Sequence, residues 1–365
     1  MSLNRLSPNC VRPLLVMCSI LLLATPLWAE EPPNLESRLQ QLEAEQQRLT
    51  HLLEESAAPA WPSSISLSGL IEVEATAAKR DDDDGHQSSA SDLTLATAEL
   101  AISAESDAGG ASLTLLYEEG EDVTVDAAII SFTHAKWFAD VGLQYLPFGN
   151  YSSRLISDPL TLELGETQAT ALQGGFTGDN LTLSLFLFNG AIDRSGDEDH
   201  LSQGGVALTL HPCEGVEIGA SYLNRLAESG AELITAPTSR EVAAASGYLN
   251  LAAGPFALTA ELLGATRRFA ASDLDTDGDG HGDKPLAWSL ETAYLACERC
   301  ELALRLEGSE ALFGQPKHRY GAALTWFPLP QIHLAVEMLD SSFGPAFGDG
   351  ESRQQQATAQ LAYTF

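Results

Sequence analysis

From Ser64 onward, apolar and polar residues alternate in short segments, and this period of two constrains the fold more than any other feature. In residues 301–307, three leucines alternate with Glu301, Ala303, Arg305 and Glu307. Strict alternation predicts strands with two unlike faces, because successive side chains of a strand point to opposite sides of the sheet. About sixteen such segments follow one another along the chain.

The connections between these segments alternate in length. Short turns are expected near residues 107–110, 179–180, 212–215, 254–255, 298–299 and 328–330, and long loops over residues 79–91, 146–168, 190–203, 227–241, 268–286, 309–318 and 340–353. A soluble β-sandwich also has alternating strands, but it is not expected to keep such regular connections. Short turns on one side and long loops on the other predict an all-β fold, an antiparallel transmembrane β-barrel of about sixteen strands.

The first residues are typical of a secretory signal peptide. Arg5 and Arg12 precede and flank an apolar run, and Ala29 offers a small residue at the cleavage site. We therefore expect residues 1–29 to be removed on export. A membrane anchor is the alternative, although the apolar run is short for a spanning helix.

Residues 30–62 are expected to form a periplasmic segment ahead of the barrel. Leu35, Leu42 and Leu49 recur every seven residues, which predicts a short coiled-coil helix followed by a linker that contains proline. A single amphipathic helix lying on the periplasmic rim is the alternative. The barrel itself is then assigned to residues 63–365.

Composition excludes several classes of function. The chain carries 51 Asp and Glu residues against 19 Lys and Arg, so phosphate would repel it and nucleic-acid binding is not expected. Beyond residue 29 there is no apolar run near the ~20 residues that a spanning helix needs. Common catalytic motifs such as Gly-x-Ser-x-Gly and His-Glu-x-x-His are missing, so we do not expect an enzyme.

Charged residues on the polar faces of the strands are expected to line the lumen, because lipid disfavours charge. This set comprises Glu72, Glu74, Glu217, Glu261, Glu291, Glu301, Arg305, Glu307, Arg319, His333 and Glu337. A barrel of this size leaves an aqueous channel. Each of these groups can equally be a solvated lumen residue without a specific role.

The loop over residues 146–168 is a candidate constriction. It contains Pro147, Gly149, Asp158, Glu163 and Glu166. Long loops without regular structure are commonly functional or disordered. We expect this loop to fold into the channel and narrow it; an exposed surface loop is the alternative.

Residues 273–283 form an acidic loop. Asp273, Asp275, Asp277, Asp279 and Asp283 alternate with other residues around glycines, a pattern that suits Ca²⁺ and its preference for oxygen ligands. The position where an EF-hand places its bidentate Glu is a lysine, so a complete EF-hand is not expected. A weaker calcium loop and a solvated acidic loop remain open; no other cofactor is expected.

Cys297 and Cys300 flank the two-residue turn at 298–299 and would face each other across a hairpin. In the oxidising periplasm they are candidates for a disulfide, and free thiols are the alternative.

Several stretches resemble the legiobactin-uptake (LbtU) family of siderophore porins. These are residues 141–150 (VGLQYLPFGN), 156–166 (ISDPLTLELGE), 188–190 (FNG), 219–226 (GASYLNRL) and 314–321 (GQPKHRYG). The order of signal peptide, coiled coil and barrel is similar too. The resemblance implies outer-membrane uptake of an iron–siderophore, without implying which one.

Three functions follow as hypotheses. The first is a porin for passive uptake of a small solute, with a ferric siderophore suggested by the resemblance. The second is a general or cation-leaning nutrient porin, and the third is a structural or adhesive barrel with calcium-binding loops. In each case the expected surroundings are outer-membrane lipid and lipopolysaccharide, and a homo-oligomer, with a trimer as one option, is expected.

Overall fold

The structure is a computed structural model that describes residues 64–190 and 201–365. The expected signal peptide and coiled-coil helix fall in residues 1–63, outside the described residues, and stay predictions. Among the residues described, no helix has the length and apolar character needed to cross a membrane.

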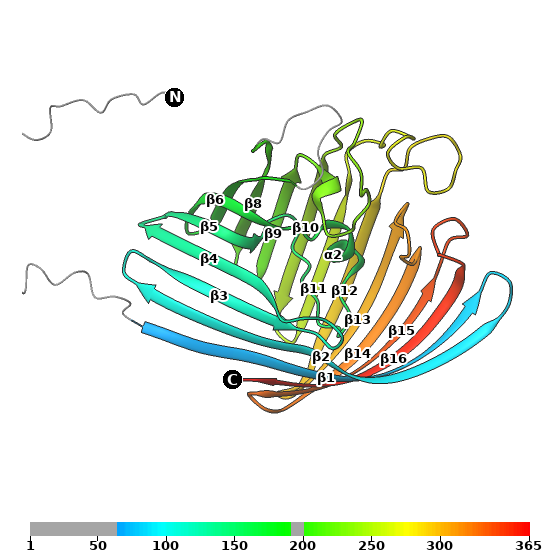
Figure 1. Cartoon of the computed structure of the whole chain (residues 1–365). Helices are drawn as coiled ribbons and strands as arrows, with labels where there is room; N and C mark the ends of the chain where they lie inside the picture. Colours follow the sequence, from blue (N-terminus) through cyan, green and yellow to red (C-terminus); the bar gives the residue numbers. More distant parts are fainter. Residues whose placement is uncertain (1–63, 191–200) are drawn as a thin grey trace, which may run out of the picture. The chain divides into compact units, whose positions relative to one another are not determined.

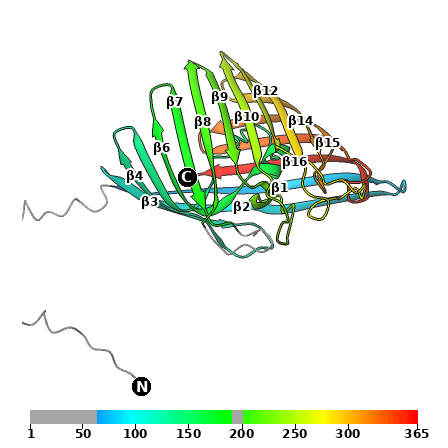
Figure 2. The same ribbon diagram turned by 90° about the horizontal axis from the view of Figure 1, so that it is seen from above.

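Sixteen antiparallel strands form one closed barrel, which confirms the expected fold class. The strands are β1 (Ser64–Asp82), β2 (Gln87–Ser106), β3 (Gly109–Tyr117), β4 (Thr124–His134), β5 (Trp137–Tyr145), β6 (Gln168–Thr177), β7 (Leu181–Phe188), β8 (Gln203–Cys213), β9 (Val216–Leu223), β10 (Ala244–Ala253), β11 (Phe256–Ala265), β12 (Leu286–Cys297), β13 (Cys300–Glu310), β14 (His318–Leu329), β15 (Ile332–Ser342) and β16 (Glu351–Thr364). Each strand pairs with the next in sequence, and β16 lies beside β1 to close the ring (Figures 1 and 2).

The two faces of the strands differ as the alternation predicts. On β13, Leu302, Leu304 and Leu306 are 42–49% exposed on the outside, whereas Arg305 and Glu307 are 1% exposed on the inside. An outward band of apolar side chains suits hydrocarbon, and the closed ring leaves no unpaired strand edge in the membrane.

The prediction of a long loop over residues 79–91 is wrong. β1 continues to Asp82 and β2 begins at Gln87, with paired residues up to Asp81 and Gln87 around a tight turn that contains Gly85. Strand pairing uses backbone groups, so it can continue where both faces of a hairpin carry polar side chains and the alternation is no longer visible.

The inside of the barrel also holds a small apolar core. The short helix α2 (Leu160–Gly165) packs against β11, β12 and β13, and the 3-10 turn η1 (Leu226–Glu228) lies in the connection between β9 and β10. Buried side chains of these two elements pack with others from the connections and from the inner face of the strands. The apolar core formed in this way includes Leu146, Phe148, Leu160, Leu164, Phe186, Phe188, Leu223, Leu226, Val242, Leu263 and Phe269. Apolar burial therefore holds α2 at one side of the lumen.

Candidate functional site

The connection between β5 and β6 turns into the barrel, and we call residues 146–167 the inward loop. Its helix α2 is visible within the ring of strands in Figure 1. Phe148, Leu160 and Leu164 are fully buried in the apolar core. The loop is thus an ordered part of the interior, packed against β11, β12 and β13 through α2.

Glutamates on the inner wall accept hydrogen bonds from the loop backbone. Glu261 on β11 accepts from the Asn150 and Tyr151 amides at 2.8 and 3.1 Å, and from the Thr161 hydroxyl at 2.9 Å. Glu291 on β12 accepts from the Arg154 amide at 2.8 Å. Loop amides cannot pair within a regular element here, so the carboxylates satisfy donors that would otherwise be buried without partners.

Two further glutamates continue this pattern. Glu337 on β15 accepts from the Ile156 and Ser157 amides at 2.8 and 3.0 Å. Glu307 on β13 accepts from the Leu160 amide, at the start of α2, at 2.8 Å. These four wall carboxylates, called the anchor glutamates below, follow the loop from Asn150 to Leu160 and define its path.

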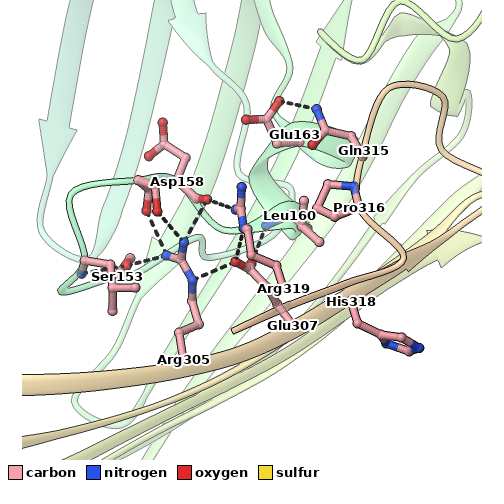
Figure 3. A network of polar contacts seen from close by, with 12 residues as sticks. Ser153, Asp158, Leu160, Glu163, Arg305, Glu307, Gln315, Pro316, His318 and Arg319 are labelled. Atoms are coloured by element: carbon pink, nitrogen blue, oxygen red, sulfur yellow. Dashed lines mark hydrogen bonds and ion pairs between the residues drawn. The ribbon is translucent and has the colours of Figure 1, made fainter. Parts of the chain in front are cut away.

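Arg305 connects the wall to the loop at the centre of this arrangement (Figure 3). Its guanidinium donates to Glu307 at 2.9 Å, to the Ser153 hydroxyl at 2.9 Å, and to the Ser157 carbonyl at 2.8 Å. Arg319 donates to the same Glu307 carboxylate and to the Asp158 carbonyl, each at 2.5 Å. Both cations therefore share the Glu307 carboxylate, Arg305 also lies 3.9 Å from Glu291, and both hold the loop.

Gly149 has a conformational reason to be glycine. Its φ of +86° lies in the left-handed region, and a Cβ there would stand 2.4 Å from the Tyr151 ring. Its amide donates to the Ser221 hydroxyl on β9 at 2.9 Å. Pro147, two residues earlier, is partly buried where the loop leaves the sheet.

The inward loop itself carries three carboxyl groups, on Asp158, Glu163 and Glu166. Burial raises the pKa of Asp158, and Arg305 and Arg319 partly offset this rise. Burial likewise raises the pKa of Glu163 and of Glu166, and the nearby charge of Asp158 raises both further. These three carboxyls are the loop side of what we call the acidic eyelet.

The wall side of the acidic eyelet is formed by β1, β2 and β4. Glu72 lies within electrostatic range of Asp158 and of Glu99 on β2. Asp126 on β4 lies within range of Glu166. Residues 81–135, which include β2, β3 and β4, contain no Lys or Arg, so this part of the wall has no cation of its own to neutralise the carboxylates.

The sequence-predicted lumen residues lie in two environments. Glu261, Glu291, Arg305, Glu307 and Glu337 are at most 5% exposed and serve the inward loop. The remaining members, Glu72, Glu74, Glu217, Glu301, Arg319 and His333, are partly exposed, with Glu74 bound to Gln360 and His333 against Phe327. Pro147, Gly149, Asp158, Glu163 and Glu166 all belong to the inward loop.

Sequence reasoning missed several inward polar residues. Ser221, Ser246 and Asn250 take part in the interior hydrogen-bond network. Their position on the polar side of the alternation is the signal that could have found them. Small uncharged residues on that side carry no electrostatic reason to single them out.

The acidic loop at 273–283 is divided between structural and exposed carboxylates. Asp273 accepts from the Ser239 amide and hydroxyl, which lowers its pKa, and Asp283 accepts from the Thr276 amide at 2.7 Å. Asp275, Asp277 and Asp279 bring their oxygens within 4.8 Å of one another. Calcium binding there stays a prediction.

Cys297 and Cys300 face each other in the register of β12 and β13, as the hairpin predicts. Both are free thiols in the structure, as is Cys213. The disulfide therefore stays a prediction that depends on oxidation.

Comparison with solved structures places this architecture among known barrels. An anion-selective porin from Comamonas acidovorans superposes with a TM-score of 0.62 at 12% identity, covering 83% of this chain and 99% of that one. The chain has a porin fold. OmpF of Salmonella typhi gives 0.57 at 13% identity over 82% and 97% of the two chains, and a loop-deletion mutant of OmpT of Vibrio cholerae gives 0.52 at 10% over 83% and 99%. At these identities the likeness shows the fold alone.

Comparison with known sequences finds only a partial match. No known family profile matches the chain. A UPF0422 protein of Coxiella burnetii is 30% identical over 191 residues, which are 48% of this chain and 41% of that protein. The match spans less than half of the relative's length, and the resemblance to the LbtU family stays a prediction.

Proposed function

We propose that the chain is an outer-membrane porin, a passive channel for small solutes whose aperture is narrowed by the inward loop. The proposal is carried by one observation: the loop is bound along its length by the four anchor glutamates on the inner faces of β11, β12, β13 and β15. A loop held at so many points can keep a defined aperture. On this reading the protein is a channel and carries out no catalysis.

The charge distribution favours cations. Arg305 and Arg319 are paired with Glu307, and Arg154 with Glu301 at 2.5 Å, so these lumen cations are largely compensated. The acidic eyelet keeps carboxylates on both of its sides. Because a low-dielectric wall focuses the field in a cleft, cations should be concentrated there and anions depleted.

Planar-bilayer recordings test the proposal. The full chain should produce stepwise conductance, and a KCl gradient should give a reversal potential with the sign of cation selectivity. Conversion of Glu72 to Gln should reduce that potential, whereas Asp340→Asn, which alters an exposed carboxylate paired with Arg353, should leave it unchanged. A lack of conductance would contradict the porin, and anion selectivity would contradict the acidic eyelet.

Selectivity is expected to depend on pH. A carboxyl with a raised pKa takes up its proton at higher pH than the ordinary range near 4, so Asp158, Glu163 and Glu166 lose their charge first as pH falls. The reversal potential should therefore begin to shrink at a higher pH than ordinary carboxyl groups would give. In a variant with all three carboxyls converted to amides, the reversal potential at neutral pH should be smaller than that of the unmodified chain, and it should change less as pH falls. A variant with the same pH profile as the unmodified chain would contradict this assignment.

The finer proposal is uptake of an iron–siderophore, and it rests on the resemblance to the LbtU family. Its test is uptake of radiolabelled iron–siderophore, and growth under iron limitation, in a deletion strain. Unchanged iron uptake would leave a cation-leaning nutrient porin, the alternative that the acidic eyelet favours. A neutral or cationic ferric complex fits this lumen better than an anionic one.

The surroundings of the barrel are part of the proposal. Exposed outward leucines and aromatic residues, including Trp137 at 63% and Trp326 at 49%, suit a lipid and lipopolysaccharide environment. Association into a homo-oligomer, with a trimer as one option, and a periplasmic N-terminal helix remain predictions from the sequence. A structural or adhesive barrel would show no selective conductance, so the same bilayer recordings separate it from a porin.

A further inference from the structure

A cavity of about 800 Å³ lies between the tip of the inward loop and strands β8 to β12. Ser152, Ser153 and Arg154 border it from the loop, and His211, Glu217 and Asn250 border it from the wall, toward the short turns. Cavities of this size hold small ligands, and polar groups that converge on one determine which ligand fits. We call it the vestibule cavity.

Arg154 supplies a cation on the loop side of the vestibule cavity. Its side chain is 46% exposed and bonded through Nη1 to Glu301. Among the described residues, no hydrogen bond is made by its Nε or Nη2. A guanidinium with donors available in its fork is suited to bind a carboxylate.

Glu217 supplies an acceptor on the wall side, beside Asn250. Glu217 is 30% exposed and accepts from Asn250 Nδ2 at 3.1 Å and from the His211 ring at 3.0 Å. Asn250 Oδ1 is buried and has no hydrogen-bond partner among the described groups. Because this oxygen is shielded from the cavity, the partly exposed Glu217 carboxylate is the acceptor that a ligand can reach.

We infer that the vestibule cavity binds small amphoteric solutes, amino acids or short peptides, with the carboxylate at Arg154 and the ammonium at Glu217. The Glu217 carboxylate has lone pairs to accept from an ammonium in addition to its present donors. The inference rests on the proposed channel, since a solute reaches this cavity through the lumen.

Blockade of the ion current by four matched peptides tests the inference. The probes are trialanine, its N-acetyl form, its C-terminal amide, and the form capped at both ends. Trialanine should block at a concentration about tenfold below each capped form, as expected for one charge-assisted contact per terminus. Because the acidic eyelet by itself favours the cationic amide, tighter block by trialanine than by this amide identifies a carboxylate site.

Two variants assign the termini. Arg154→Gln should remove the advantage of a free carboxylate only, and it keeps the loop anchored, since Arg154 reaches Glu291 through its backbone amide. Glu217→Gln should remove the advantage of a free ammonium only. Two matched controls should leave the block unchanged: Glu298→Gln and Arg299→Gln, both in the turn between β12 and β13 and outside the lining of the cavity.

Equal block by all four peptides would overturn the inference, as would discrimination that survives both variants. The open-channel current reports the proposed function independently. Conductance without discrimination therefore contradicts the amphoteric site alone, whereas a protein without conductance contradicts the porin as well.

Discussion

Replacing Glu307 with Gln is expected to destabilise the barrel by about 3–5 kcal/mol, the range for a buried ion pair that loses one partner. The Glu307 side chain is fully buried and is bonded to Arg305 at 2.9 Å and to Arg319 at 2.5 Å. An amide keeps the shape but no longer compensates the two guanidiniums, and Arg305 is left with Glu291 at 3.9 Å. Urea unfolding of the protein in lipid vesicles, followed by tryptophan fluorescence, measures the loss.

The matched control for this effect is Asp340→Asn on β15. Asp340 pairs with Arg353 at 2.8 Å, with side chains 44% and 51% exposed, so its loss should cost about 0–1 kcal/mol. Both substitutions replace one carboxylate by its amide on a strand of the barrel. Equal losses for the two variants would show that the Glu307 pair is not the stabilising contact that its burial implies.

The barrel could be predicted from the sequence because its two faces meet different solvents. Leucines at 302, 304 and 306 alternate with Arg305 and Glu307, and a charged side chain cannot face hydrocarbon without a large cost. The same rule identified the inward side of β11, β12 and β15. It failed for the hairpin of β1 and β2, where water surrounds both faces and the alternation ends before the strands do.

The partners of the inward charges could not be predicted in the same way. Glu291 binds Ser153 and Arg154, which lie 138 and 137 residues away in the sequence. Alternation assigns a residue to a face, but only strand register and the path of the loop decide which groups meet. The difference in partners decides what each carboxylate can do. Glu291 and Glu307 are paired with Arg305, whereas Glu72 forms part of the acidic eyelet.

Deleting residues 152–166 and joining the ends with a short Gly-Ser linker is expected to raise single-channel conductance about twofold or more, because a wider pore carries more current. The deletion removes α2 and most of the loop amides that contact the anchor glutamates. The bond between the Leu146 amide and the Thr167 carbonyl, at 2.8 Å, is retained at the base of the loop. Cation selectivity should fall as well, since Asp158, Glu163 and Glu166 leave with the segment.

A control must distinguish the effect of a wider pore on conductance from the effect of shortening any loop. The connection between β11 and β12, drawn in yellow in Figure 1, extends away from the ring, and its shortening within the exposed residues 277–281 should leave conductance unchanged. The deletion also frees Glu291, Glu307 and Glu337 from their loop partners, so part of any gain in cation current comes from uncovered charge. Recording in 1 M and 0.1 M KCl separates the two contributions, because screening suppresses the electrostatic one at high salt. An increase that persists at 1 M would reflect aperture, and an unchanged conductance at both concentrations would contradict a constriction by the inward loop.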